Sequence, residues 1–440
     1  MNQLALAVSA FVLIGSLAGQ TEQRGGESSS LKEAPRVYSS HPDDPWNQIF
    51  TALFTRTVET RLSDEIDGSE PHVPFGPRGF LMSLSVSKHT VTRTEYGDRA
   101  INPLYPSFMS ARGVLDVLTD PRYAELKNAL ESALSEKSER THVCRALMQS
   151  DLWAAFDILE QRSRFRDSNA AMLLERRSDL LALTAQLIRK LALTRDEIEN
   201  LPNNFNARRK GPSLPPLFEK ESDWIEIQWI PGRTHDFEAD YRRAARVFVK
   251  PLYSPADRDL FLRNLQRARR PANELLAVAL TTQLLLVTDK ERVVPSPIIN
   301  AVQLRTFVRG REGEITRGEI EQFELSRKLL LEDTATGGLV RFEEGAAAYL
   351  PSSGNDYDFA SWHFGDAGQE PPILATLRSR CHACHFGDMT RIATLAVHAR
   401  PPLPLIRYLD PLGNEHASYV AAKKQASDTF EALLRHWRLP

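Results

Sequence analysis

Two cysteines and two histidines stand close together near the C-terminal end of the chain, in the order Cys381-His382-Ala383-Cys384-His385. A thiolate is a strong nucleophile and a soft metal ligand, and a neutral imidazole is a common metal ligand. The chain has only 3 cysteines and 11 histidines among 440 residues, so chance placement predicts far less than one match to this pattern. The cluster therefore predicts thiol or metal chemistry at this point of the sequence.

The order Cys-X-X-Cys-His resembles the haem-attachment motif of c-type cytochromes. The resemblance is confined to this motif and its immediate surroundings. It implies one covalently bound haem c, with the thiols of Cys381 and Cys384 added to the two vinyl groups of the porphyrin. It also implies that His385 is the proximal ligand of the haem iron.

The ligand at the sixth iron position decides what such a haem does. A second protein ligand favours electron transfer, and an open position favours ligand binding or catalysis. His398 is the first candidate, because it lies thirteen residues after His385 and just before Pro401, where the chain can fold back over the haem. Met389 follows His385 by four residues and is expected to pack at the haem edge on the proximal side. The further candidates are His363, His416 and His436.

Other interpretations of the motif stay open at this point. A zinc site could use both cysteines and His385 with a further histidine such as His398, although structural zinc sites usually pair two short ligand clusters. A redox-active Cys-X-X-Cys would need a strand before the motif, whereas residues 373–381 have a helical pattern. A plain disulfide between the two cysteines is also open. The remaining cysteine, Cys144, lies in an apolar helical stretch and is expected to be a buried side chain rather than a ligand.

The first 20 residues predict export of the protein. Residues 4–18 are almost continuously apolar or small, and Ser16-Leu17-Ala18 resembles a signal-peptidase cleavage site. Residues 1–20 are therefore interpreted as a signal peptide, and the polar, Gly- and Ser-rich residues 21–40 as a disordered linker. Because no Lys or Arg precedes the apolar stretch, an uncleaved segment that tethers the protein to a membrane is an alternative. We expect a periplasmic or secreted protein.

The composition is typical of a soluble protein, with 42% hydrophobic and 25% charged residues and a formal net charge of -2. A charge this close to zero gives no global basic field, so no nucleic acid partner is expected.

The patterns divide the remainder of the chain into three regions. Residues 41–201 carry apolar residues at three- and four-residue spacing and are predicted to be helical. A Pro- and Asn-rich stretch at 202–221 marks a boundary, and residues 222–350 are predicted to be an α+β region. Residues 351–440 are the predicted haem-bearing segment. The fold class is thus predicted as mainly α with minor β (α+β), ending in a helical c-type haem-binding segment.

Particular elements are predicted in the second half. Residues 224–230, 302–308 and 339–342 have the residue types of strands. The long apolar run at 272–287 is predicted to be a buried helix, and residues 417–437 a terminal helix.

The leading hypothesis for function is an exported mono-haem c-type cytochrome that passes single electrons to a redox partner protein. A second hypothesis is a haem enzyme or small-ligand sensor with an open iron site, since a simple carrier does not need so long a chain before the haem. A third is a non-redox secreted protein with zinc at the Cys-X-X-Cys-His motif. Whether the protein is an enzyme stays open at this stage.

Overall fold

The structure is a computed structural model that describes a large part of the chain. The described residues are 36–41, 43–54, 58–62, 72–75, 80–83, 87–91, 117–137, 139–160, 171–209, 214–229, 243–253, 255–267, 274–313, 315–341, 347–348, 375–376, 406–409 and 413–438. All of them belong to one unit, Ala34–Pro440. No helix among them is both long enough and apolar enough to cross a membrane.

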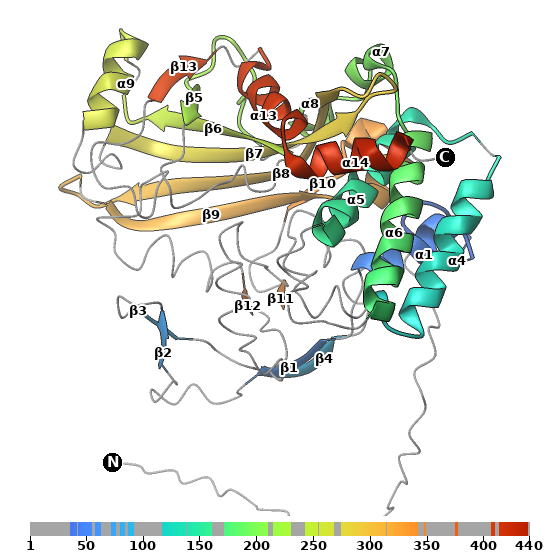
Figure 1. Ribbon diagram of the computed structural model, residues 1–440. Helices are drawn as coiled ribbons and strands as arrows, with labels where there is room; N and C mark the ends of the chain where they lie inside the picture. Colours follow the sequence, from blue (N-terminus) through green and yellow to red (C-terminus); the bar gives the residue numbers. More distant parts are fainter. Residues whose placement is uncertain are drawn as a thin grey trace, which may run out of the picture. The chain divides into compact units, whose positions relative to one another are not determined.

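A seven-stranded sheet dominates the second half of the chain, with the strand order β10-β9-β8-β7-β6-β5-β13 (Figure 1). Every pair of neighbouring strands in it is antiparallel. From β5 to β10 each strand pairs with the next one along the chain, and only β13 joins from a distant part of the sequence. The strands are β5 (Ile225–Trp229), β6 (Arg243–Pro251), β7 (Leu275–Val287), β8 (Val293–Arg309), β9 (Ile315–Leu325), β10 (Leu339–Arg341) and β13 (Ile406–Leu409).

The prediction of a mainly α fold with minor β is wrong, and the apolar run at 272–287 explains the error. This run forms strand β7 in the middle of the sheet rather than a buried helix. Nearly every residue of β7 is buried, so the apolar–polar alternation of a half-exposed strand is missing. A continuous apolar run of this kind does not distinguish a buried strand from a buried helix. The strands predicted at 224–230, 302–308 and 339–342 are confirmed as parts of β5, β8 and β10.

Strand β8 is irregular near its start, where Pro295 and Pro297 cannot donate to a neighbouring strand. Its register with β7 shifts on both sides of Gln283. Just before the stretch of β8 that pairs with β9, the side-chain amide of Asn204 donates to the carbonyl oxygen of Ile299 at 2.8 Å and accepts from the Ile299 N–H at 2.7 Å. The side chain of Asn204 thereby fixes helix α8 against β8.

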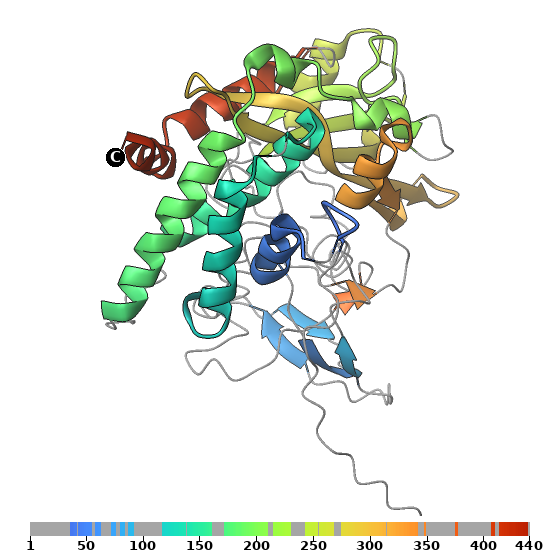
Figure 2. The same ribbon diagram turned by 90° about the vertical axis from the view of Figure 1, so that its right-hand side faces the viewer.

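The helices pack against one another and against the sheet. Helix α4 contacts α1 and α6, while α5 contacts α6 and β7 (Figures 1 and 2). The helices are α1 (Pro45–Phe54), α4 (Arg122–Ser135), α5 (His142–Glu160), α6 (Ala171–Lys190), α7 (Arg195–Glu199), α8 (Asn204–Arg209), α9 (Arg258–Arg267), α10 (Arg327–Glu332), α13 (Glu415–Gln425) and α14 (Asp428–Arg438). Short antiparallel strand pairs are β1 (Val58–Leu62) with β4 (Ser87–Val91), β2 (His72–Phe75) with β3 (Phe80–Ser83), and β11 (Ala347–Ala348) with β12 (Ala375–Thr376).

Helix α1 begins with a standard capping arrangement. The carboxylate of Asp44 accepts a hydrogen bond from the N–H of Trp46 at 2.9 Å, and Pro45 occupies the first helical position. The side-chain amide of Asn47 then holds the preceding backbone of residues 37–41 through hydrogen bonds of 2.8 to 2.9 Å. This short segment is consequently tied to α1.

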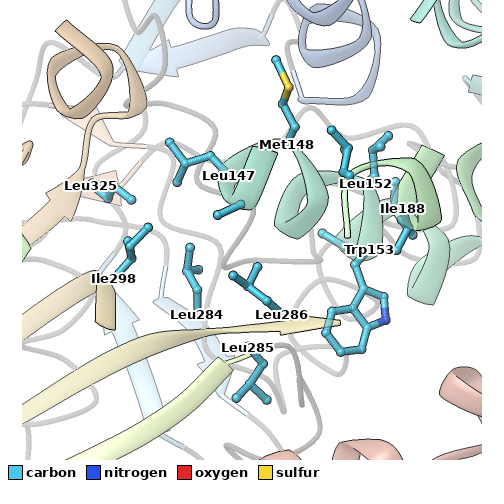
Figure 3. Close-up of a cluster of buried hydrophobic side chains, with 14 of the residues drawn as sticks. Leu147, Met148, Leu152, Trp153, Ile188, Leu284, Leu285, Leu286, Ile298 and Leu325 are labelled. Atoms are coloured by element: carbon cyan, nitrogen blue, oxygen red, sulfur yellow. The ribbon is translucent and has the colours of Figure 1, made fainter. Parts of the chain in front are cut away.

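The core between α5 and β7 holds the helical half of the molecule to the sheet. Figure 3 shows its buried side chains, which include Leu147, Leu152 and Trp153 of α5 and Leu284 and Leu286 of β7. Leu285 points to the opposite side of the strand, as the alternation of a strand requires. Gln149 of α5 accepts from the N–H of Val287 at 2.8 Å and donates to its carbonyl at 2.9 Å. The end of β7, where Val287 pairs with Val293 of β8, is thus also hydrogen-bonded to a helix.

The described parts of residues 351–440 combine two short strands with two helices. Strand β13 is the edge strand beside β5, α13 contacts β6 and β8, and α14 contacts α5 and α6. Strand β12 lies within residues 373–381, where the sequence predicts a helix. The terminal helix predicted at 417–437 is divided into α13 and α14 by a turn at Ala426 and Ser427. Helices α13 and α14 bury apolar side chains in the same core as the sheet.

Candidate functional site

The residues of the predicted haem site lie outside the described residues. These are Cys381, Cys384, His385 and the candidate distal ligand His398. The structure does describe the two strands that flank them along the chain. Strand β12 pairs with β11, and β13 pairs with β5 at the edge of the seven-stranded sheet. Along the sequence, the motif therefore lies between β12 and β13.

Cys144 is buried in α5, as the sequence predicts. Its side chain is 6% exposed, and its Sγ atom lies 3.8 Å from the Sδ atom of Met148. Burial raises the pKa of the Cys144 thiol to about 12, so the thiol stays protonated at neutral pH. Because the thiolate is the form that attacks disulfides and binds metals, Cys144 takes no part in such chemistry.

Two further candidates for the sixth iron ligand, His416 and His436, belong to the described C-terminal helices. His416 is buried at the start of α13, with its ring 6.1 Å from that of Tyr419. His436 of α14 packs edge-on against Phe156 of α5, with the ring centres 5.8 Å apart. Burial lowers the pKa of His436 below its ordinary value, which favours the neutral imidazole. Both histidines have packing roles in the described structure.

A buried network around Asp151 of α5 was not predicted from the sequence. Arg327, the first residue of α10, donates from Nε and Nη2 to the two carboxylate oxygens of Asp151 at 2.9 and 2.7 Å. The phenol of Tyr38 also donates to the Oδ2 atom of Asp151. Burial and the adjacent Asp151 charge raise the pKa of Tyr38 well above its ordinary value. The network joins the segment before α1 to α5 and α10.

A second buried ion pair lies at Asp157, further along α5. The ammonium group of Lys424 in α13 donates to Asp157 at 2.6 Å and to the hydroxyl of Thr429 at 2.9 Å. The same ammonium lies 5.1 Å from the ring centre of Trp153. This pair joins α5 to the C-terminal helices.

A third buried ion pair holds the chain just after β13. Arg246 of β6 donates to both carboxylate oxygens of Glu226 in β5, at 2.8 and 2.6 Å. It also donates to the carbonyl of Gly413 at 2.9 Å, and its guanidinium lies 4.7 Å from the ring centre of Phe218. Gly413, which lies just before α13, is thereby fixed to the sheet.

Two of the three buried ion pairs can be partly recognised from the sequence, because their acids stand in an apolar stretch. Asp151 and Asp157 are acids within the apolar stretch that forms α5, and acids in such a stretch require a buried partner. Their cationic partners are 176 and 267 residues away along the chain, so no local pattern identifies them. Within the described part of the chain, no group of three or more His, Cys, Asp or Glu side chains could hold a metal ion.

Comparison of the chain with known protein families, with curated proteins and with solved structures found no match.

Proposed function

We propose that this chain is an exported protein that carries one covalent c-type haem and passes single electrons to a redox partner protein. The observation that carries the proposal is the motif at residues 381–385, together with the apolar N-terminal stretch. Haem attachment by thioethers takes place outside the cytoplasm, so the two features fit one another.

The third cysteine also supports the proposal. Cys144 is buried and protonated, so only Cys381 and Cys384 remain to carry thiol chemistry in this chain. Two thiols three residues apart and a directly following imidazole are the donor set that a c-type haem requires. In this assignment the two thiols anchor the porphyrin and His385 binds its iron. The bound haem would supply reversible one-electron chemistry at iron.

A haem enzyme or small-ligand sensor with an open iron site is the second candidate. It is favoured by the large body of helices and strands that precedes the motif along the chain, because an electron carrier does not need strands β5 to β10 or the helices before them. Carbon monoxide separates the two candidates. A six-coordinate haem that does not bind carbon monoxide supports the carrier, and a five-coordinate haem that binds it supports the second candidate.

The haem itself is tested on protein expressed in a host with periplasmic haem attachment. After acid–acetone extraction, a pyridine haemochrome spectrum reports whether haem remains bound and how many vinyl groups are saturated. We expect the parent chain to retain its haem with a thioether-type band. The Cys381→Ala and Cys384→Ala variants should each shift that band, since one vinyl group stays free, and the double variant should lose the haem.

Two variants provide matched controls. His382→Ala alters the same motif without touching a proposed ligand, so it should keep the parent spectrum, whereas His385→Ala should lose the proximal ligand. Cys144→Ala should also retain the haem, because this thiol is buried elsewhere. If the parent chain holds no haem after extraction and contains zinc instead, the proposal is wrong and the motif is a zinc site.

A further inference from the structure

The end of helix α4 brings several main-chain carbonyl groups around one cation, the ammonium group of Lys190. This lysine is the last residue of α6, and its Nζ atom donates to the carbonyl oxygens of Ala133, Leu134 and Glu136 at 3.0, 2.9 and 2.6 Å. An ammonium group has three N–H donors, so each of them can go to one of these oxygens. We call the three carbonyl groups the α4 carbonyl cage.

The place of the cage at a helix end explains why it attracts a positive charge. The last four carbonyl groups of an α-helix have no partner within the helix, and the helix dipole puts a partial negative charge on them. Helix α4 ends at Ser135, and the backbone of Glu136 is extended, with φ −61° and ψ 129°. The last turn of α4 contains no basic residue, so the compensating cation comes from another helix.

Helix α6 uses its other cations in a similar way. These also donate to carbonyl oxygens of neighbouring segments: Arg176 to Leu118 at 2.9 Å, Arg177 to Leu159 near the end of α5 at 2.5 Å, and Arg189 to Trp437 near the end of α14 at 2.7 Å. Arg176 and Arg177 bind a carboxylate as well. In the described part of the chain, the ammonium of Lys190 is held by main-chain oxygens alone, so the cage recognises a cation without an acidic side chain.

Glu136 connects the cage to helix α1. Its carbonyl accepts from Lys190, while its carboxylate accepts from the indole N–H of Trp46 at 2.9 Å and from the guanidinium of Arg140 at 2.5 Å. A cation in the cage therefore fixes the backbone of the residue whose side chain holds Trp46.

We propose that the α4 carbonyl cage is a site for a monovalent cation of the ammonium or potassium type, which this chain fills with its own Lys190 side chain, and that the bound cation positions Glu136 for Trp46. Main-chain carbonyl oxygens replace the hydration shell of such ions in other proteins. A free cation from solution enters the cage when residue 190 carries no ammonium group. The inference goes beyond the proposed function and does not depend on it, because no residue of the 381–385 motif takes part.

The test removes the tethered cation and offers a free one to the full chain. Lys190→Met keeps an apolar stem and leaves the cage without its ammonium group, so the urea midpoint followed by circular dichroism should fall in tetramethylammonium chloride, whose cation has no N–H donor. Methylammonium chloride or potassium chloride at the same ionic strength should recover part of that loss, whereas the parent midpoint should be the same in these salts. If the variant keeps the parent midpoint, or if its midpoint is the same in every salt, the proposal is overturned.

Two further variants keep this test decisive. Lys137→Met removes an exposed lysine close to the same helix end and should show no response to the choice of cation. Lys190→Gln retains a hydrogen-bond donor and serves where Lys190→Met does not fold, with the same recovery expected in methylammonium. A response of Lys137→Met equal to that of the Lys190 variants would contradict the assignment of the cage.

The positioning of Glu136 has a separate readout. Trp46→Phe removes the indole donor, so the recovery of Lys190→Met by methylammonium should be smaller in that background. The same recovery with and without the indole would show that the cation does not act on Trp46 through Glu136.

Discussion

Helix α5 carries two buried acids that are partnered in different ways. Asp151 is held by both nitrogens of the Arg327 fork and by the phenol of Tyr38, so several donors fix its two oxygens. Asp157 accepts from the ammonium of Lys424, which also donates to the hydroxyl of Thr429. A guanidinium that binds both oxygens of a carboxylate fixes the orientation of that carboxylate, whereas an ammonium interacts with it as a point charge of no fixed direction. The carboxylate of Asp151 is therefore held in a more fixed orientation than the carboxylate of Asp157.

The surroundings of the two acids differ too. The region around Asp151 contains Tyr38, whose pKa is raised, and the nearby Cys144, whose pKa is raised to about 12. His436, whose pKa is lowered by burial, packs on Phe156, the residue before Asp157 in α5. We therefore expect the Asp151 region to respond to base and the Asp157 region to respond to acid. Four predictions sharpen this comparison.

The largest effect is expected for Arg327→Met. This change leaves Asp151 buried without its cation, and breaking a buried ion pair costs about 3–5 kcal/mol of unfolding free energy. Urea denaturation followed by circular dichroism measures the loss. Arg327→Lys, which keeps the charge but not the fork, should recover part of it. A loss below about 1 kcal/mol for Arg327→Met, the range of an exposed ion pair, would contradict the structural assignment.

Lys424→Met should have a smaller effect. This change also leaves a buried acid without its cation, but it removes one hydrogen bond from Asp157 where Arg327→Met removes two from Asp151. The loss should therefore lie near the lower end of the same range, at about 3 kcal/mol. Urea denaturation followed by circular dichroism again measures the loss of unfolding free energy. If Lys424→Met destabilises the protein more than Arg327→Met, the ordering of the two regions is reversed and the argument from the guanidinium fork fails.

The third prediction concerns alkaline pH. In the unfolded chain the Cys144 thiol titrates near 9.0, while in the folded protein it keeps its proton until about pH 12. The folded state then binds more protons, so its stability falls as the pH rises between these values, by up to about 1.4 kcal/mol per pH unit. Denaturation curves from pH 8 upward should show this slope, and Cys144→Ala should reduce it. An unchanged slope in Cys144→Ala would show that the thiol is not buried as described.

The smallest effect is expected on the acid side. Burial holds the pKa of His436 below 6.5, so its contribution to stability is present above that pH and is lost as the pH falls through the lower folded value. His436→Phe keeps the ring contact with Phe156 and removes the titration. Its denaturation midpoint should depend less on pH below 6.5 than that of the parent. Equal dependence in both proteins would argue against the partly buried position of His436.

Local patterns predicted some elements and failed at others for a definite reason. The strand at 224–230 was predictable because apolar and polar residues alternate along it. The strand at Leu275–Val287 was not, because both of its faces are covered and no alternation remains. The haem site residues are a sequence prediction, since the motif lies outside the described residues.

The sequence by itself determined the chemistry that this chain carries: two thiols and an imidazole in one short motif, a third cysteine in an apolar stretch, and acids at positions 151 and 157 of another. Only the tertiary structure decided the partners of those acids, because Arg327 and Lys424 reach α5 from distant parts of the chain. It also decided that the apolar run at Leu275–Val287 is a central strand rather than a helix. Burial and pairing depend on contacts between residues that are far apart in sequence, whereas the Cys-X-X-Cys-His pattern is complete within five residues.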